Sequence, residues 1–439
     1  MSGLEIGGIG FLVLLVLLAL RIPIGVAMLA VGMVGYVAIA GHVALLSYLK
    51  TAAYWQFSSF GLAVIPLFVL MGQFAAKAGL STALFRAANV WLGHHRGGIA
   101  MAAIGGCAGF GAIAGSSLAT AATMGQVALP ELRRYNYSGA LATGTLAAGG
   151  TLGILIPPSV VLIVYAIIVE ANIAVLFQAA FIPGILAVIG YLLAIAVVVR
   201  INPAAGPAGQ RASARERWEA LVDIWPVLLI FLLVMGGIYT GFFTPSEAAG
   251  VGSVGTFLIA VTRGGMRLKG FFEALLETAQ TTGMIFLILL GAAIFNAFLG
   301  FSELTQTAAN YFAGSGYAPL TVMLAMVVLF IVLGMVMDSL SMILLTVPVF
   351  WTIIAGLDFG MDPEDVKIWF GIIALIVVEV GLITPPVGLN VFVINSMARD
   401  VPMIETFKGV LPFLLTDALR VTLIIVFPLV SLWLPSVMN

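Results

Sequence analysis

The sequence is poor in charged residues for its length. Only 8% of its 439 residues are Asp, Glu, Lys or Arg, whereas 62% are hydrophobic. A water-soluble domain of this size would then expose a largely apolar surface, which such domains avoid. The formal net charge of -1 also excludes the strongly basic surface that attracts nucleic acid. We therefore expect a protein whose solvent is the lipid bilayer and which has no nucleic-acid partner.

Cysteine, histidine and the motifs of common enzyme chemistry are also scarce. Cys107 is the one cysteine, so a disulfide within the chain is impossible and a thiolate metal site is not expected. The three histidines, His42, His94 and His95, lack His-Glu-x-x-His spacing, and the sequence has no Gly-x-x-x-x-Gly-Lys-Ser/Thr loop. These absences argue against a metallopeptidase and a P-loop ATPase, and we predict a protein that is not an enzyme.

Long apolar runs make up most of the chain. A helix needs about 20 such residues to cross a hydrocarbon core of about 30 Å. Two apolar stretches, 97–134 and 318–356, contain the short polar tips Gly115-Ser116-Ser117 and Asp338-Ser339-Leu340-Ser341, and we predict that each is a re-entrant hairpin. The start of the chain lacks a signal-peptide pattern, so its first run should remain as a span. Ten full spans are predicted, at 5–20, 24–41, 58–78, 139–168, 174–199, 224–241, 246–262, 281–300, 366–397 and 410–434.

The distribution of Lys and Arg gives these spans an orientation. If the hairpins enter and leave on one side and the N-terminus is outside, fifteen of the eighteen Lys and Arg residues fall inside. Only Lys50 and Lys367 fall outside, and Arg420 lies within a span. Basic residues concentrate on the cytoplasmic side of membrane proteins. The split therefore supports the predicted spans and places both termini outside.

The two halves of the chain resemble each other. The pattern Ser81…Ala87-Ala88-Asn89…Gly93 recurs as Ser302…Ala308-Ala309-Asn310…Gly314, and a Pro-Pro pair follows each hairpin. Corresponding spans run in opposite directions, which predicts an inverted-topology repeat in an all-α polytopic membrane protein. The predicted parts are scaffold helices in 1–57, a first repeat in 58–199 with hairpin 97–134 and broken helix 139–168, a cytoplasmic linker in 200–223, scaffold helices in 224–280, and a second repeat in 281–439 with hairpin 318–356 and broken helix 366–397.

Four polar interruptions fall inside the predicted membrane segments. Two are the hairpin tips, and two are the breaks from Gly149 to Pro158 and from Gly381 to Pro386. Unpaired backbone groups are too costly to face lipid, so broken helices occur where protein or a hydrated cavity receives them. The repeat symmetry predicts that all four meet near the middle of the membrane.

Each interruption should end one helix and begin another. We expect Ser117 and Ser339 to be N-caps and each Pro-Pro pair to begin a second half-helix, because proline fits the first helical turn. The N-terminal ends of helices favour an anion, and the carbonyls at their C-terminal ends favour a dehydrated cation. The arrangement predicts a binding site for an anionic substrate and sodium-like ions.

Several polar residues near the breaks have competing interpretations. A carboxylate in the membrane costs roughly 2.5–3.5 kcal/mol on insertion scales, so Asp338 is expected in an ion site, as a helix cap, or in both roles. Glu379 is either part of the site or a member of a proton-sensitive packing pair. Asn390 either contacts the substrate or makes an interhelical hydrogen bond. Asp417 and Arg420 have i,i+3 spacing and should pair with each other.

Together these motifs resemble one known family, the large membrane subunit of the tripartite ATP-independent periplasmic transporters, of the dicarboxylate-transporter M type. The resemblance covers essentially the whole chain. Its motifs are Ile65-Pro66-Leu67-Phe68 with Gly72, Gly115-Ser116-Ser117 before Ala128-Leu129-Pro130-Glu131, Ile156-Pro157-Pro158-Ser159, Phe243-Thr244-Pro245-Ser246-Glu247-Ala248-Ala249, Gly334 with Asp338, and Thr384-Pro385-Pro386-Val387-Gly388-Leu389-Asn390.

The resemblance implies a fold like that of the ion transporter superfamily, an elevator mechanism and coupling to Na+. It implies two separate partners, a small four-helix membrane subunit and a periplasmic binding protein that delivers a small carboxylate substrate. The location it implies is the bacterial inner membrane, which makes both termini periplasmic.

The resemblance also implies two ion sites at the breaks. The first would use Ser116, Ser117 and the break that contains Gly149, Gly153 and Pro157, and the second would use Asp338, Ser339, Gly381 and Thr384. The residues expected to contact substrate are Ser116, Ser117, Ser159, Ser341, Thr384, Pro386 and Asn390.

Other functions remain open from the sequence. A stand-alone ion-coupled carboxylate carrier of related fold would need no binding protein. A membrane-embedded enzyme would need a nucleophile with a base, or a metal cluster, and neither pattern is found. A channel would need a continuous polar lining. C4-dicarboxylates, sialic acids and other organic acids are all compatible with the sequence as substrates.

Overall fold

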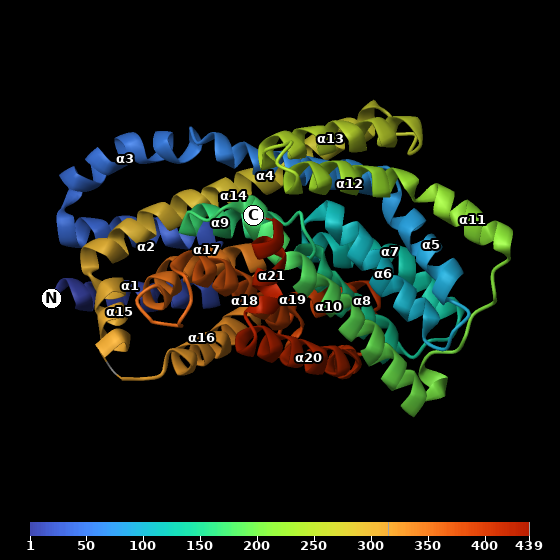
Figure 1. Cartoon of the computed structure of the whole chain (residues 1–439). Helices are drawn as coiled ribbons and strands as arrows, with labels where there is room; N and C mark the ends of the chain where they lie inside the picture. The colour runs from blue at the N-terminus through green and yellow to red at the C-terminus, as the bar shows by residue number, and fades with distance from the viewer. Residues whose placement is uncertain (315, 439) are drawn as a thin grey trace.

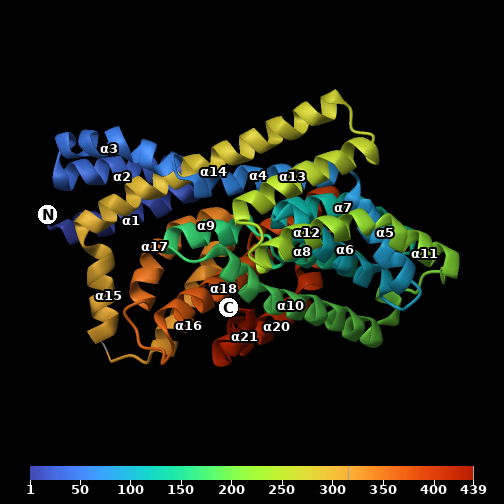
Figure 2. The same cartoon turned by 45° about the horizontal axis from the view of Figure 1, so that its top comes forward.

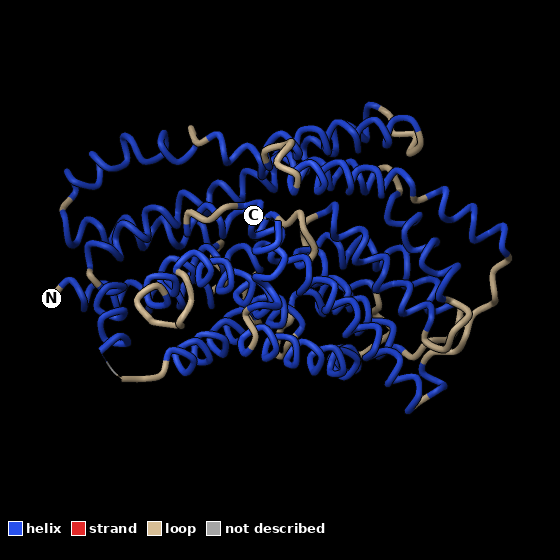
Figure 3. The backbone as a smooth tube through the Cα atoms, viewed as in Figure 1, coloured by secondary structure: helices blue, strands red, loops and turns tan. Residues whose placement is uncertain are grey.

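Every regular element in the computed structural model, which describes residues 1–314 and 316–438, is a helix (Figure 3). The first half contains α1 Gly3–Ala19, α2 Ile24–Ala40, α3 His42–Phe57, the short 3-10 helix η1 Phe60–Ala63, α4 Val64–Lys77, α5 Leu80–Leu92, α6 Gly98–Ala114, α7 Ser117–Arg134, α8 Gly139–Leu155, α9 Val160–Val169 and α10 Ile173–Ile201. The second half contains η2 Pro203–Ala205, α11 Ala214–Asp223, α12 Trp225–Tyr239, α13 Pro245–Thr262, α14 Leu268–Ser302, α15 Leu304–Gly314, α16 Pro319–Gly334, α17 Ser339–Ile354, α18 Pro363–Ile383, α19 Leu389–Met397, α20 Met403–Val426 and α21 Leu429–Met438. The all-α prediction is confirmed; residues 315 and 439 of the predicted second repeat lie outside the described residues.

The helices coincide with the predicted membrane spans. Among the described residues, five helical segments are long and apolar enough to cross a membrane, namely Phe60–Lys77, α10, α14, α18 and α20. The α8–α9 and α11–α12 pairs reach the same length only as bent pairs, with bends of 45° and 42°. The two N-terminal spans correspond to α1 and α2, which are apolar helices of 17 residues each. A helix or a pair of helices therefore occupies each predicted span.

Three segments between and within the predicted spans have structure that the spans do not describe. Residues 42–57, which fall between two predicted spans, form helix α3. The last ten residues of the linker 200–223 form α11, which begins with a capping box of Ser213 and Glu216. The predicted span 410–434 is interrupted between α20 and α21, where Phe427 precedes Pro428 and leaves the helical conformation. A residue before proline is disfavoured in the helical region, which explains this break.

The helices form two groups in space. In both views α2, α3 and α4 lie along α14 in the upper part of the molecule, and the hairpins and broken helices lie below them (Figures 1 and 2). We call these two groups the upper layer and the lower body; the body consists of α6 to α10 and α16 to α21. The short helices α5 and α15 extend downward at opposite ends of the molecule (Figure 2). There α5 packs against α6, and α15 packs against α17.

The inverted repeat is visible in the contacts between equivalent glycines. In the first half, a Cβ added at Gly111 of α6 would lie 2.6 Å from the Cα of Gly153 in α8. In the second half, a Cβ added at Gly381 of α18 would lie 2.6 Å from the Cα of Gly334 in α16. In each half, therefore, the first helix of the hairpin approaches the broken helix so closely that only glycine fits.

The motif Thr244-Pro245-Ser246-Glu247 has a local physical explanation. The Thr244 side chain accepts a hydrogen bond from the Glu247 N–H, and the Glu247 carboxylate accepts one from the Thr244 N–H at 2.8 Å. Pro245 occupies the first helical position, where its missing N–H would have no partner. The motif is therefore the start signal of α13, and it lies away from the breaks.

Candidate functional site

The first hairpin turns at Gly115 and Ser116. Gly115 ends α6 in the left-handed conformation, with a φ of 61°, which favours glycine. Ser116 is the N-cap of α7, and its hydroxyl accepts a hydrogen bond from the Ala119 N–H. The prediction that Ser117 would be the cap is wrong by one residue, since Ser117 occupies the first helical position. The tip therefore presents the N-terminal end of α7 and two adjacent serines.

The second hairpin turns between Gly334 and Ser339. Asp338 is the N-cap of α17; its Oδ2 accepts a hydrogen bond from the Ser341 N–H at 3.1 Å, and its Oδ1 accepts one from the Ser341 hydroxyl. Ser339, which was predicted as the cap, instead lies at the first helical position, as Ser117 does in the first hairpin. The capping role of Asp338 is therefore observed, and its role in an ion site stays a prediction.

Both Pro-Pro pairs lie within the breaks and not at the start of the following helix, so that prediction is wrong. In the first half, α9 begins at Val160, and Ser159 caps it by accepting from the Leu162 N–H at 3.3 Å. In the second half, α19 begins at Leu389 after Gly388, which has a φ of 58°. A serine cap or a left-handed glycine begins each half-helix, and the prolines, whose missing N–H groups need no partner, fill the gap.

In each half, the hairpin tip lies against the break of the same half. A Cβ added at Gly153 would lie 2.5 Å from the Ser116 carbonyl oxygen, and one added at Gly115 would lie 3.1 Å from the Pro158 carbonyl oxygen. In the second half, the Gly388 N–H donates to the Met335 carbonyl at 3.2 Å. The structure thus brings each tip and its break together as the symmetry predicts.

The two tips also meet each other at one cavity. A cavity of about 510 Å³ is lined by Ser116, Ser117, Asp338 and Ser339 from the tips. Its other walls come from helices of the lower body, namely α6 to α9, and from the upper layer, which contributes Gln73 of α4 and residues of α14. The first turns of α7 and α17 therefore face a common space between the upper layer and the lower body.

A second cavity, of about 780 Å³, lies on another side of the second tip. It is bordered by Asp338 and Ser341 together with Val387 and Leu389 after the second break. Arg21, between α1 and α2, reaches its edge. Asp338 therefore borders both cavities, and the tip between α16 and α17 separates them.

The other predicted substrate residues do not line the first cavity. Ser159 and Asn390 are fully buried, and the Asn390 amide donates to the Ala147 carbonyl at 3.3 Å, an interhelical hydrogen bond. The Thr384 hydroxyl donates to the Val380 carbonyl at 2.6 Å, while Pro386 is exposed at the second break. The substrate roles of these four residues stay predictions.

One residue of interest at the first tip was missed. Thr120 is fully buried, and its hydroxyl oxygen has no hydrogen-bond partner among the described residues. A Cβ added at Gly153 would lie 2.4 Å from that oxygen and 2.5 Å from the Ser116 carbonyl oxygen. Buried polar atoms are normally paired, so this oxygen is a candidate ion ligand. Its spacing of three residues from Ser117 on one helix face was the available signal.

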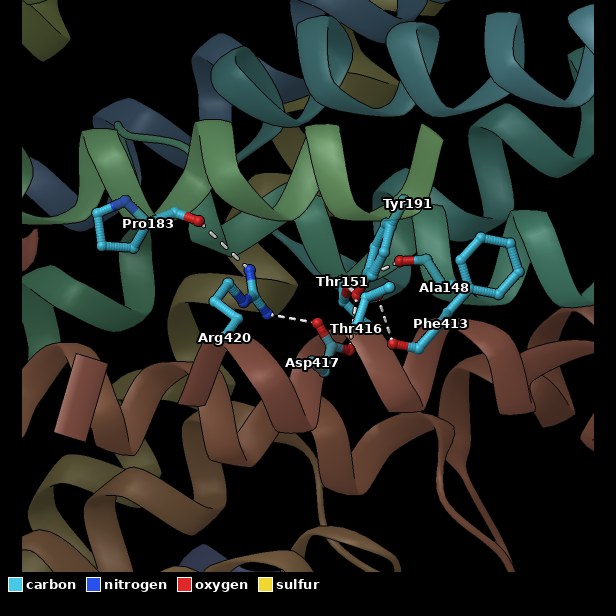
Figure 4. Close-up of polar contacts among 8 residues, drawn as sticks. All are labelled: Ala148, Thr151, Pro183, Tyr191, Phe413, Thr416, Asp417 and Arg420. Carbon is cyan, nitrogen blue, oxygen red and sulfur yellow. Dashed lines mark hydrogen bonds and ion pairs between the residues drawn. The ribbon is translucent and has the colours of Figure 1, made fainter. Parts of the chain in front are cut away.

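A buried polar network joins the first broken helix to two other helices of the body (Figure 4). Arg420 and Asp417 pair at 2.7 Å, as predicted, and both are almost fully buried. The Tyr191 hydroxyl donates to Asp417 at 2.8 Å and lies 2.9 Å from the hydroxyl of Thr151 in α8. The guanidinium group also donates to the Pro183 carbonyl. Helices α8, α10 and α20 are therefore connected by charge-assisted hydrogen bonds in the interior.

The fold and the facing tips define an inverted-repeat membrane transporter. The family model for the "Tripartite ATP-independent periplasmic transporter, DctM component" matches residues 11–430, so the chain belongs to this family. It is 37% identical over 378 residues to the C4-dicarboxylate TRAP transporter large permease protein DctM of Pseudomonas aeruginosa, covering 85% of this chain and 86% of that protein. It is 32% identical over 379 residues to the sialic acid TRAP transporter large permease protein SiaM of Vibrio cholerae, covering 86% and 87%.

A solved transporter has a similar fold. The YdaH transporter of Alcanivorax borkumensis superposes with a TM-score of 0.60 at 16% sequence identity, and the match covers 89% of each chain. At this level of sequence identity, the match shows only that the two folds are alike. The relatives are named transporter permeases, so the chain is a large permease subunit of a multi-pass membrane transporter and not an enzyme.

Proposed function

We propose that this chain is the translocation subunit of a sodium-coupled transporter that imports a small organic acid such as a C4-dicarboxylate, a sialic acid or a similar carboxylate. We place it in the bacterial inner membrane with both termini periplasmic. In this proposal a periplasmic binding protein delivers the acid, and a small four-helix membrane subunit completes the transporter. The names of the relatives, which include C4-dicarboxylate and sialic acid transporters, support this range of substrates.

The observation that carries the proposal is the cavity between the two hairpin tips. Its volume of about 510 Å³ falls within the range of about 300–1,000 Å³ found for small-molecule sites. The first turns of α7 and α17 line it, so unpaired N–H groups and the positive ends of two helix dipoles are near its contents. Among its described lining residues there is no Lys or Arg, so the helix ends and bound cations would supply the attraction for a carboxylate.

The residues at the tips also suit sodium ions. Hard monovalent cations take oxygen ligands, and half-helix C-terminal ends supply them in transporters of this general type. The first site would use the Ser116 carbonyl and the Thr120 hydroxyl. It would also use Gly149 and Gly153 of α8 and Pro157 in the break that follows α8. The unpartnered Thr120 oxygen is the observation that supports it. The second site would use Asp338, Ser339, Gly381 and Thr384. Bound Na+ would supply positive charge beside the carboxylate.

We further propose that transport moves the lower body against the upper layer as an elevator. The first cavity lies between the two groups, with walls from both. The tips and breaks that would hold ions and substrate all belong to the body. Rigid movement of the body would then carry the site from one side of the membrane to the other without rebuilding it.

Reconstituted uptake tests the proposal. The chain is placed in proteoliposomes with its small membrane subunit and binding protein from the same organism, and uptake of a panel of radiolabelled acids is measured with and without an inward sodium gradient. We expect saturable uptake of one acid class that requires Na+ and both partners. Uptake by the chain alone would indicate a stand-alone carrier, and sodium-independent uptake would contradict sodium coupling.

A further inference from the structure

One carboxyl group in the body contacts both hairpin tips. Glu379 lies on α18 two residues before Gly381, and it is 1% exposed. Its Oε1 accepts a hydrogen bond from the Ser339 hydroxyl at 2.6 Å. Ser117, which lines the same cavity as Ser339, is near enough to affect this carboxyl group electrostatically. A buried carboxyl group is costly unless it is paired or hydrogen-bonded, so these two serines determine where it lies.

The two serines occupy equivalent positions in the two repeats. Ser117 is the first residue of α7, and Ser339 is the first residue of α17. Both line the first cavity beside the N-caps Ser116 and Asp338. Glu379 therefore connects the residues that adjoin the two proposed ion sites.

The first repeat has no second copy of this connection. The residue equivalent to Glu379, two positions before the close-packed glycine of the first broken helix, is Thr151. Its hydroxyl faces the Tyr191 hydroxyl at 2.9 Å and the Ala148 carbonyl at 2.7 Å. Thr151 is thus joined to the Asp417 network of Figure 4 and not to a hairpin tip. The link between the tips rests on one side chain from the second repeat.

The carboxyl group also has unused hydrogen-bonding capacity. Glu379 Oε2 is buried and has no hydrogen-bond partner among the described residues. Oε1 accepts from Ser339, so Oε2 is the oxygen left to accept a hydrogen bond from another donor such as the nearby Ser117 hydroxyl. A displacement of either serine then changes the position of the carboxyl group and, through it, the other serine.

We propose that Glu379 is a positioning residue that couples the two ion sites, so that sodium binding at one hairpin tip favours binding at the other. The inference rests on the proposed sodium-coupled function. Coupling of this kind appears as sigmoid dependence of transport on Na+ concentration, and linkage makes it reciprocal between the sites. The coupling acts through hydrogen bonds, so it depends on an acceptor at position 379 and not on its charge.

Sodium titration of uptake in the reconstituted transporter tests the proposal. Glu379→Met keeps the side-chain volume and removes both oxygens, and we expect its Hill coefficient for Na+ to fall to one. We also expect its half-saturating Na+ concentration to rise by about 5-fold or more, the lower end of typical coupling. The rate at saturating Na+ should be largely retained. Glu379→Gln keeps the acceptor, so it should keep a Hill coefficient above one.

Thr346→Val is the matched control. It removes another buried hydroxyl of α17, which donates to the Met342 carbonyl within the same helix, and it should leave the sodium titration unchanged. A wild-type Hill coefficient in Glu379→Met overturns the inference, and so does its loss in Glu379→Gln. If Glu379→Met is not recovered folded, Glu379→Leu, which also lacks an acceptor, takes its place in the titration. If the wild type shows no sodium dependence, the proposed function itself fails, which is a separate result.

Discussion

Asp338 is the residue at which capping and ion binding can be separated. Its carboxylate caps α17 and borders both cavities. Loss of an N-cap costs about 1 kcal/mol, which is too little to prevent folding. An asparagine at this position keeps the cap and loses the charge. Asp338→Ala therefore removes both the cap and the charge, whereas Asp338→Asn removes only the charge.

We expect Asp338→Ala and Asp338→Asn both to lose most sodium-driven uptake while remaining folded in the membrane, because neither supplies a carboxylate to the second ion site. Uptake and size-exclusion profiles of the purified variants measure these two outcomes. Asp365→Ala, at an exposed position in the first turn of α18, is the control and should transport normally. Normal sodium dependence in Asp338→Ala would remove Asp338 from the site.

At the residue scale, one local charge pair was predictable from its spacing, whereas the helix caps at the two tips were each predicted one residue too late. The i,i+3 spacing of Asp417 and Arg420 was sufficient to predict their pairing, which the structure confirms. Thr120 was missed because its significance depends on the Ser116 carbonyl and on Gly153 of another helix. Local spacing does not reveal contacts between helices that are distant in the chain.

At the scale of elements, the close glycine pairs set the packing between each hairpin and its broken helix. We expect Gly381→Ala to lower both thermal stability and uptake, because its Cβ would lie 2.6 Å from the Cα of Gly334 and backbone atoms cannot move aside as a side chain can. Overpacking of this kind typically costs about 1–3 kcal/mol. Thermal unfolding of the variant in detergent measures the change.

Gly283→Ala is the matched control for this substitution. It also replaces a helical glycine, but beyond its chain neighbours and the adjacent backbone of its own helix, no described atom lies within 4 Å of the added Cβ. Alanine favours helix over glycine by about 1 kcal/mol, so this variant should be as stable as the wild type or more so. Equal stability of Gly381→Ala and Gly283→Ala would show that the contact is not tight.

The elements were largely predictable because membrane spans follow from hydropathy and length. The same criterion missed α3, whose helix carries Lys50 and other polar residues and is too polar to be identified as a span. The interruption at Phe427 and Pro428 was overlooked for a different reason. Proline is tolerated inside other helices of this chain, for example at Pro183 of α10 and Pro412 of α20, so a proline alone does not identify a break.

For the whole molecule, the proposed elevator movement predicts a change of distance between the two groups of helices. A spin label at Ala119, on the first tip, and one at Met284, on α14, face the same cavity from the body and from the upper layer. We expect the distance distribution between them to shift when Na+ and substrate are added. Pulsed electron paramagnetic resonance measures this distance.

Labels within one group provide the control for movement. Ala119 and Phe392 both lie on the body, on α7 and α19, which pack against each other. Their distance should stay the same under the same additions. If neither pair changes, the body does not move against the layer; if both change equally, the tips deform and no rigid movement occurs.

The overall arrangement was predictable from the repeat, but the difference in exposure between the two breaks was not. Each Pro-Pro pair begins four residues after a glycine, yet the pair in the first half is buried and the pair in the second half is exposed. The residues that follow the second pair, Val387 and Leu389, border the second cavity near Arg21. Equivalent sequences cannot indicate which of them a given conformation exposes.

Because Cys107 is buried, the reactivity of its thiol reports local unfolding of the natural chain. The thiol has no exposed surface, and its sulfur packs so near α8 that a Cβ at Gly149 would lie only 2.7 Å from it. Alkylating reagents therefore reach it only after α6 separates from α8. The rate of alkylation in the unmodified protein consequently measures how often this part of the body opens, without any engineered label.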